Sequence, residues 1–390
     1  MAAAIAVFVG RWVSLSVYRG TQMSDTDLQF TPLDTFHRKH GAKMSAFAGY
    51  YMPVSYPLGV LKEHEHARAA ASLFDVSHMG QAILSGDNVV AAMESLVPGD
   101  IEGLASHGTR YTLLTNDQGG IRDDLMVSRL GDALYVVLNA GCKVENFAYM
   151  RERIGDQVEI EDLTNRALLA LQGPKASEVL TRLVPAVRQM NFMNIAELNI
   201  NDIPCLITRS GYTGEDGFEI SLPAEDVEDF AQLLIDEDEV ELAGLGARDS
   251  LRLEAGLCLH GSDIDLTTTP IEAALTWVVN KNRRQAGAFP GAQIIIDQIA
   301  NRSTKKRVGI KPEGRAPARA GTEITDMDGN PIGAITSGSF GPTIGGPVAM
   351  GYVDIEFFKP ETPVQLMVRG KAMPARVIKL PFVPHRYFTS

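Results

Sequence analysis

Two adjacent carboxylates are the first candidates for chemistry in this sequence. Asp123 and Asp124 follow a pair of glycines and precede an apolar run in the segment GGIRDDLMV (119–127). Burying a carboxylate is costly unless hydrogen-bond donors or a positive charge meet it. The segment begins a predicted strand, and side chains along a strand alternate between its two faces. The two acids therefore point to opposite sides, and at most one of them can face a given pocket.

A third acid lies inside an apolar strand. The segment GYTGEDGFEI (211–220) places Glu219 between Phe218 and Ile220, so alternation puts its carboxylate on the face opposite theirs. That face is either solvent or a pocket whose groups donate hydrogen bonds to the acid. The residues alone leave both interpretations open.

Two arginines stand one helical turn apart in GARDSLRLEAG (246–256). One interpretation is a surface helix on which Arg248 and Arg252 pair with nearby acids. The other is that Arg248 faces a ligand carboxylate, a role that suits the planar donor fork of a guanidinium.

Several common catalytic and metal-binding patterns are absent from the sequence. It has no HExxH, no Gly-x-Ser-x-Gly elbow, no P-loop and no GxGxxG after a strand. Its cysteines, Cys142, Cys205 and Cys258, form neither a CxxC pair nor a Cys/His cluster, so we expect buried free thiols and no metal site. The lone His78 is interpreted as structural. These residues predict a ligand-binding protein without fixing its reaction.

The elements that must position these residues predict a mixed α+β body. Three β-rich runs, 110–117, 123–130 and 133–140, are separated by short Gly-containing turns and predict a meander. Apolar spacing and helix-start signals predict helices over 86–97, 142–155, 174–185, 224–237, 246–259, 268–279 and 290–300. From Arg307 onward the runs are β-rich, which predicts a small C-terminal β-barrel.

Length and charge set further limits. The 390-residue chain suits two or three domains, and its net charge of −12 argues against a nucleic-acid partner. Residues 1–23 are set apart, because the first 22 contain two arginines and no acid and their apolar run is too short to span a bilayer. They are either a mitochondrial presequence or an extension before a true start at Met23. We adopt the second interpretation, which predicts a cytoplasmic protein without membrane association.

The longer motifs are collinear with those of a known family. From about Thr31 to Tyr387 the chain resembles the glycine cleavage system T-protein, an aminomethyltransferase, in FDVSHMGQ, GGIRDDLMV, LQGP, RSGYTGEDGFEIS, GLGARDSLRLEAGLCL, FPGA, AITSG, VAMGYV and LPFVPHRY. The resemblance implies a three-domain cloverleaf around a central folate channel. Its expected parts are residues 24–300, a folate-binding core of two interleaved α+β subdomains, and residues 301–390, the barrel.

The resemblance also implies a reaction. The family passes the carbon of an aminomethyl group, carried on the lipoyl arm of the H-protein, to tetrahydrofolate. Ammonia, 5,10-methylenetetrahydrofolate and dihydrolipoyl H-protein result. We therefore expect tetrahydrofolate as co-substrate, the lipoylated H-protein as partner, no metal, and a monomeric enzyme.

Individual roles follow by position in the family motifs. Asp124 matches the essential aspartate, which orients the attacking folate nitrogen and stabilises positive charge as ammonia leaves; whether it also moves a proton is left open. Asp123 is expected to be structural. The expected folate-binding residues are Glu219, Arg248 and Tyr387, with Tyr212, Met79 and Asn139 lining the channel.

Three other functions are compatible with parts of this pattern or with the fold it implies. A folate-dependent demethylase of a small methylated substrate would share the fold and much of the folate site, and stays as the alternative. A folate-binding scaffold without turnover is a weaker third. The folate-binding iron–sulfur assembly factors carry a KGCYxGQE-type motif, and the corresponding stretch here, RLEAGLCLHGSDID, lacks it.

Overall fold

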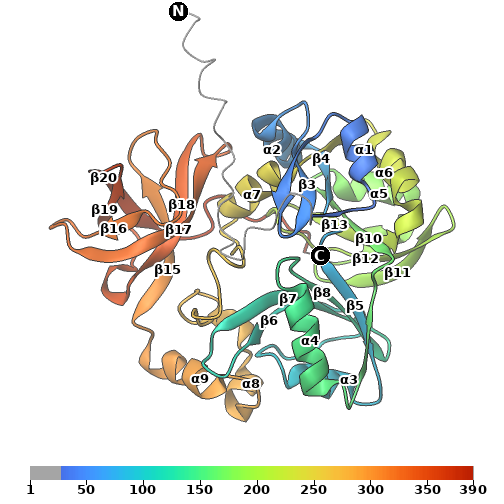
Figure 1. Cartoon of the computed structure of the whole chain (residues 1–390), viewed down its shortest axis with the longest axis horizontal. Coiled ribbons are helices and arrows are strands. Elements are labelled where there is room, and N and C mark those ends of the chain that lie inside the picture. The colour runs from blue at the N-terminus through green and yellow to red at the C-terminus, as the bar shows by residue number, and fades with distance from the viewer. Residues whose placement is uncertain (1–27, 390) are drawn as a thin grey trace, which may run out of the picture.

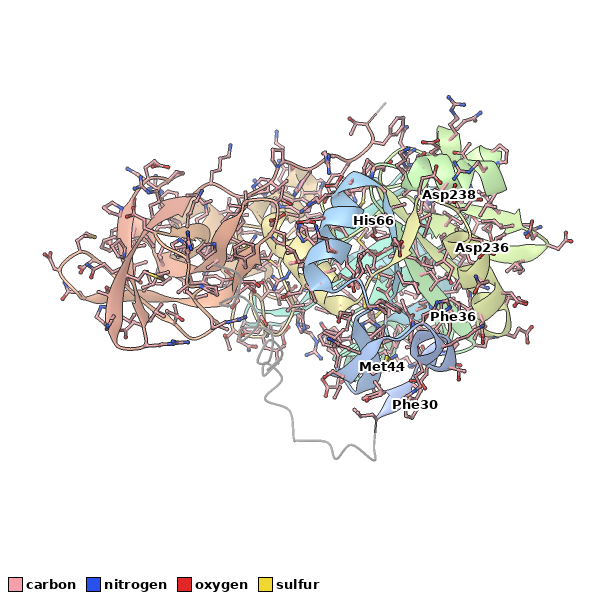
Figure 2. All side chains as sticks on the ribbon, turned by 90° about the horizontal axis from the view of Figure 1, so that it is seen from above. Phe30, Phe36, Met44, His66, Asp236 and Asp238 are labelled. Atoms are coloured by element: carbon pink, nitrogen blue, oxygen red, sulfur yellow. The ribbon has the colours of Figure 1, made fainter. Side chains whose placement is uncertain are left out.

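Three lobes surround a common centre in this protein (Figure 1). The computed structural model describes residues 28–389, so the proposed start at Met23 lies outside the described residues. Viewed from above, the β-barrel occupies one end of the molecule, while Phe36, His66 and Asp236 lie in the other part (Figure 2). No helix of the described chain is both long enough and apolar enough to cross a membrane. The α+β class with a C-terminal barrel is as predicted.

The first lobe is built on a six-stranded sheet with the order β11-β12-β13-β10-β4-β14. Its strands are β4 (Ala71–Asp75), β10 (Arg166–Gln172), β11 (Ile195–Ile200), β12 (Ile203–Thr208), β13 (Gly217–Pro223) and β14 (Val240–Leu242). One apolar core joins the sheet to α1 (Asp34–Lys39), α5 (Ala176–Leu183) and α6 (Val227–Ile235). Phe218 and Ile220 point into this core, so Glu219 lies on the opposite face as alternation predicts.

The second lobe contains the predicted meander. Its five-stranded sheet has the order β6-β7-β8-β5-β9, with β5 (Gly80–Ser85), β6 (Thr109–Thr115), β7 (Ile121–Leu130), β8 (Ala133–Leu138) and β9 (Glu159–Asp162). The core of this lobe joins these strands to α3 (Val89–Glu94) and α4 (Lys143–Ile154). The chain therefore leaves the first sheet after β4, builds this whole sheet, and returns at β10.

Helix α7 (Leu245–Glu254) lies between the lobes (Figure 1). It packs against α2 (Val60–Ala69) and β3 (Tyr50–Ser55) on one side and against the barrel on the other. Strand β3 belongs to a small sheet, β1-β3-β2, with β1 (Gln29–Phe30) and β2 (Lys43–Phe47).

One predicted helix is wrong. Residues 268–279 form turns and a 3-10 helix, Thr276–Val278, before α8 (Lys281–Ala286) and α9 (Ala292–Asn301). Thr269 and Glu272 cap each other's backbone N–H groups, at 3.0 and 3.2 Å, which is how a helix begins. Ala274 then adopts a left-handed φ of 60°, so the turn cannot continue as a helix. The apolar residues of the segment pack into two different clusters, which explains their helix-like spacing.

The third lobe is a closed barrel with the order β15-β18-β17-β16-β19-β20. Its strands are β15 (Lys305–Pro312), β16 (Glu323–Thr325), β17 (Pro331–Gly341), β18 (Gly346–Asp354), β19 (Pro363–Val368) and β20 (Lys371–Ile378). A buried polar network joins it to α7. Arg252 Nη1 donates to Asp263, in the loop after α7, at 2.7 Å, and Nη2 donates to the hydroxyl of Ser337 on β17 at 2.9 Å; Ser337 in turn donates to Asp263 at 2.8 Å. The surface interpretation of Arg252 is therefore wrong, because its side chain is buried.

Replacing Arg252 should weaken the contact between α7 and the barrel. In Arg252→Met the buried Asp263 carboxylate loses its counter-charge, which typically costs about 3–5 kcal/mol. Urea unfolding followed by circular dichroism would measure the loss. The matched control is Arg182→Met, which removes exposed ion pairs to Glu237 and Glu239 and should cost about 1 kcal/mol or less. An equal loss of unfolding free energy in the two variants would contradict a stabilising role for Arg252 at this contact.

Candidate active site

One large cavity lies where the lobes meet. Its volume is about 2760 Å³. Its wall is formed by β2, β3 and α2, by the sheets of the first and second lobes, by α7, by the barrel and by the segment after the barrel. All seven residues predicted for the site line it: Met79, Asp124, Asn139, Tyr212, Glu219, Arg248 and Tyr387. The fold thus brings together residues that are scattered along the chain.

Asp124 is held at both carboxylate oxygens. The Tyr111 hydroxyl donates to Oδ2 at 3.0 Å, and the Asn139 amide donates to Oδ1 at 2.7 Å. Tyr111 comes from β6, the strand beside β7, and its ring stacks on Trp277 at a centroid distance of 5.5 Å. These two donors fix the carboxylate of Asp124 in one orientation at the cavity wall.

Asp123 lies behind the wall, on the other face of β7, as strand alternation predicts. It is fully buried and accepts hydrogen bonds from the backbone N–H of Asp124 at 3.0 Å, from the backbone and side chain of Asn139 at 3.3 and 2.8 Å, and from Asn146 at 3.2 Å. Burial and the neighbouring Asp124 charge raise the pKa of Asp123 to about 6. Burial also raises the pKa of Asp124, against the opposing effects of His260, Tyr111 and Asn139.

Asn139 has a more specific place than the predicted channel lining. Its side-chain nitrogen lies 2.8 Å from Asp123 Oδ1, 2.7 Å from Asp124 Oδ1 and 3.0 Å from the Asp124 carbonyl oxygen. All the donor capacity of this amide is therefore directed at the two acids. The geometry makes Asn139 a clamp that positions Asp124.

A second polar group lies on the sheet of the first lobe. Glu219 accepts a hydrogen bond from the Ser210 hydroxyl at 3.2 Å, and its other oxygen lies 3.8 Å from Arg248 Nη2. Arg248 lies over the Tyr212 ring, 5.2 Å from its centre, and Tyr212 donates its hydroxyl hydrogen to the Cys258 carbonyl. Arg248 Nη1 is buried without a hydrogen-bond partner in the described chain. One donor group of the guanidinium is therefore not used by the described chain.

The C-terminal segment after the barrel, 379–389, returns to the body and completes the cavity. The ring of Tyr387 stacks on Phe192 with centroids 4.0 Å apart and planes 8° from parallel. Arg386 Nη2 donates to buried Glu215 at 2.6 Å, and His385 Nε2 contacts the Ala255 carbonyl at 2.8 Å. These contacts hold the Phe192–Tyr387 stack in the wall of the cavity.

Sequence reasoning missed several residues of this wall. Tyr111, Phe192, Trp277 and His260 all line the cavity. Tyr111 had a usable signal, because the meander predicts that its strand lies beside the strand of Asp124. The other three lie outside regular strands and α-helices, so no periodic pattern marks their direction.

Comparison with known proteins places the chain in a family. The model described as GCVT N-terminal domain matches residues 33–283, and the model described as glycine cleavage T-protein C-terminal barrel domain matches residues 305–384. The chain belongs to the glycine cleavage T-protein family. It is therefore an enzyme, an aminomethyltransferase, as the motifs indicated.

Relatives of established name are similar over nearly the whole chain. Aminomethyltransferase, mitochondrial, of Canis lupus familiaris is 46% identical over 384 residues, which is 96% of this chain and 95% of that protein. The Homo sapiens protein of the same name is 47% identical over 371 residues, 93% and 92% of the two chains. The crystal structure of glycine cleavage system aminomethyltransferase T from Bartonella henselae matches with a TM-score of 0.89 at 46% identity, covering 93% of this chain and all of that one.

The names of these relatives bear on localisation. Both of the sequence relatives above are called mitochondrial, which is compatible with the presequence alternative for residues 1–23. That segment lies outside the described residues, and the cytoplasmic interpretation stays a prediction.

The acid pair should leave a signature in the pH dependence of stability. The folded pKa of Asp123, about 6, lies above its ordinary value of 3.8, so the folded state holds the proton more tightly than the unfolded state. Its stabilising contribution is therefore complete below pH 3.8 and is lost as the pH rises to about 6. The thermal midpoint of the wild type, minus that of Asp123→Asn, should fall across this window.

The exposed Asp156 supplies the control for this measurement. Asp156→Asn should run parallel to the wild type between pH 4 and pH 6. A difference between wild type and Asp123→Asn that stays constant, or that grows with pH, would contradict the burial of a charged pair at this strand.

Proposed function

We propose that this aminomethyltransferase transfers the methylene carbon of an aminomethyl group, carried on the lipoyl arm of an H-protein, to tetrahydrofolate. The products are ammonia, 5,10-methylenetetrahydrofolate and the dihydrolipoyl protein. The observation that supports this best is the convergence of Asp124, Glu219, Arg248 and Tyr387 on one cavity of about 2760 Å³. Tetrahydrofolate supplies the nucleophilic nitrogens, and the chain supplies their orientation.

The residues of the cavity fit a folate. A pterin edge presents an N–H and an amino group side by side, which the Glu219 carboxylate can accept together. Arg248 contributes the buried Nη1 that has no partner in the described chain. The rings of Tyr212 and of the Phe192–Tyr387 stack line the same cavity and offer flat apolar surface to a flat ligand.

Asp124 is the proposed catalytic residue. Tyr111 and Asn139 hold its two oxygens at 3.0 and 2.7 Å, so the carboxylate needs little reorganisation to receive a folate nitrogen. Its negative charge also stabilises the positive charge that develops at the aminomethyl carbon as ammonia leaves. The partner would deliver this carbon through the mouth of the cavity, since a lipoyl arm is long and thin.

A demethylase, the alternative raised by the sequence, would use the same folate site. The two reactions give different products. A demethylase would yield 5-methyltetrahydrofolate in place of the 5,10-methylene compound, and mass spectrometry of the folate product separates them. We expect the methylene product.

Asp124→Ala should abolish most turnover. Losing a positioned carboxylate of this kind costs about 10²–10⁴-fold in kcat, whereas folate binding through Glu219 and Arg248 should change little. The assay supplies tetrahydrofolate and aminomethyl-loaded H-protein and measures ammonia release. Full turnover by a folded Asp124→Ala enzyme would show that the catalytic assignment is wrong.

Glu219→Gln should weaken folate binding. A hydrogen bond to a charged group contributes about 1.5–3 kcal/mol, so the dissociation constant of tetrahydrofolate should rise about 10- to 100-fold. Isothermal titration calorimetry measures it. The matched control is Glu197→Gln, an exposed acid on β11 of the same sheet, which should bind folate as the wild type does; an unchanged affinity in Glu219→Gln would remove this residue from the folate site.

A further inference from the structure

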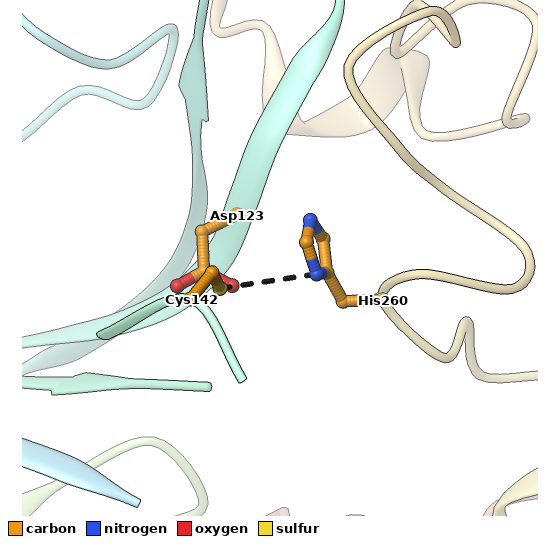
Figure 3. Close-up of side chains that lie close together, drawn as sticks. All are labelled: Asp123, Cys142 and His260. Atoms are coloured by element: carbon orange, nitrogen blue, oxygen red, sulfur yellow. Dashed lines mark hydrogen bonds between the residues drawn. The ribbon is translucent and has the colours of Figure 1, made fainter. Parts of the chain in front are cut away.

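Three potential metal ligands lie close together beside the strand that carries Asp124 (Figure 3). They are Asp123 on β7, Cys142 at the start of α4, and His260 in the loop after α7, and their ligand atoms all lie within 4.8 Å of one another. Cys142 Sγ and His260 Nδ1 are 3.8 Å apart although 118 positions separate them in the sequence. The sequence has no Cys/His cluster, but the fold brings one cysteine and one histidine together.

We propose that Asp123, Cys142 and His260 bind one divalent transition-metal ion of the Zn²⁺ type, and that this ion inhibits the enzyme. A carboxylate oxygen, a thiolate and an imidazole nitrogen form a donor set that suits Zn²⁺ and Co²⁺ better than Mg²⁺ or Ca²⁺. Three protein ligands with one open position are also a common arrangement for zinc.

The distances are close to those that an ion would require. Donors about 2.0–2.3 Å from a tetrahedral ion lie roughly 3.5 Å apart. The Cys142–His260 separation of 3.8 Å is near this value, and a shift of about 1 Å brings the widest pair to it. Cys142 and His260 are attached to a helix start and to a loop, so each can make such a shift without disturbing a β-ladder.

The surroundings leave ligand capacity free. Oδ1 of Asp123 is held closely, at 2.8 and 3.0 Å, whereas Asn146 and the Asn139 backbone donate to Oδ2 over longer distances, 3.2 and 3.3 Å. His260 Nδ1, the ring nitrogen that faces Cys142, has only the long contact with the sulfur at 3.8 Å, and Nε2 is buried without a partner among the described residues. Asn146 and Asn139 already orient Asp123, as outer-shell residues do in metal sites.

Charge favours a cation here as well. Asp123 is buried and Asp124 is half-buried at the cavity wall, yet neither forms an ion pair with a lysine or arginine of residues 28–389. A bound ion would supply the missing positive charge. On binding, the Cys142 thiol releases its proton to solvent and its sulfur donates an electron pair to the metal, so no oxidant or reductant is needed.

Inhibition follows from the position of Asn139. An ion that draws Asp123 toward itself pulls this acid away from the amide that also holds Asp124. Asp124 then loses its fixed orientation. This consequence rests on the proposed role of Asp124, whereas the binding of the ion does not.

Cobalt provides a direct reading of the site. The full chain is first freed of metal with a chelator and then titrated with Co²⁺, while the thiolate-to-cobalt charge-transfer band and the ligand-field bands of tetrahedral cobalt are followed. We expect one ion per chain. Cys142→Ser should lose the charge-transfer band, and His260→Phe should weaken cobalt binding by at least about tenfold, the lower end of the loss expected even for an outer-shell change.

Cys205→Ser is the matched control, because Cys205 is also a buried free thiol but lies on β12 in the core of the first lobe. It should keep the full cobalt spectrum. Circular dichroism establishes that each variant is folded. If Cys142→Ser does not fold, His260→Phe still tests the site. Two results would overturn the site. One is the absence of the thiolate-to-cobalt band in the wild type. The other is persistence of that band in folded Cys142→Ser together with an unchanged affinity of His260→Phe for cobalt.

Activity then tests the inhibition separately. Zn²⁺ at saturation should lower the kcat of the wild type and of Cys205→Ser by at least about tenfold, and the ratio of rates with and without Zn²⁺ should approach one in His260→Phe. If cobalt binds as described but saturating Zn²⁺ leaves the wild-type rate unchanged, the inhibition is disproved and the metal site is not. A metal-free wild type that shows no aminomethyltransferase activity, although it gives the expected cobalt spectrum when titrated, would instead disprove the proposed function and leave the metal site intact.

Discussion

The side-chain amide of Asn139 holds in place two carboxylates that the backbone makes neighbours. Asp123 and Asp124 repel each other, and neither forms an ion pair with a lysine or arginine in the described chain. Their proximity therefore depends on N–H donors directed at them by Asn139 and by Asn146 on α4. The pairing of β7 with β8 brings Asn139 to this place, because it follows directly after β8. The position of Asp124 at the cavity wall therefore depends on the pairing of β7 with β8.

Helix α7 also places buried charged side chains, and these contact the first lobe, the barrel and α2. Successive turns of one short helix serve three neighbours: Arg248 faces Glu219 in the cavity, Arg252 pairs with Asp263 at the barrel, and Glu254 accepts from Arg68 and contacts His64 on α2. Buried charges of this kind contribute little net stability but penalise any other arrangement. The helix therefore sets how the lobes sit around the cavity more than it strengthens the fold.

Much of this arrangement follows from local patterns. Strand alternation alone separated Asp123 from Asp124 and placed Glu219 opposite Phe218, and the change in composition near Arg307 located the barrel. Which acid acts came only from the family motifs, since alternation has no preference between faces. The segment 268–279 was predicted wrongly because helix-like spacing also arises when a chain is buried on several sides. The meeting of Cys142 with His260 depends on tertiary packing, and no spacing in the sequence encodes it.

The return of the chain after the barrel has a mechanical consequence. Domains joined by one linker can swing about it, and relative motion is their default. Here the barrel is tied to the body twice: by the chain that enters β15 and by the segment that leaves β20 and ends in the Phe192–Tyr387 stack. Two separate attachments turn a hinge into a closed linkage, which permits small sliding and blocks wide rotation. A ligand must therefore enter through rearrangement of side chains and loops at the mouth, with the three lobes keeping their places.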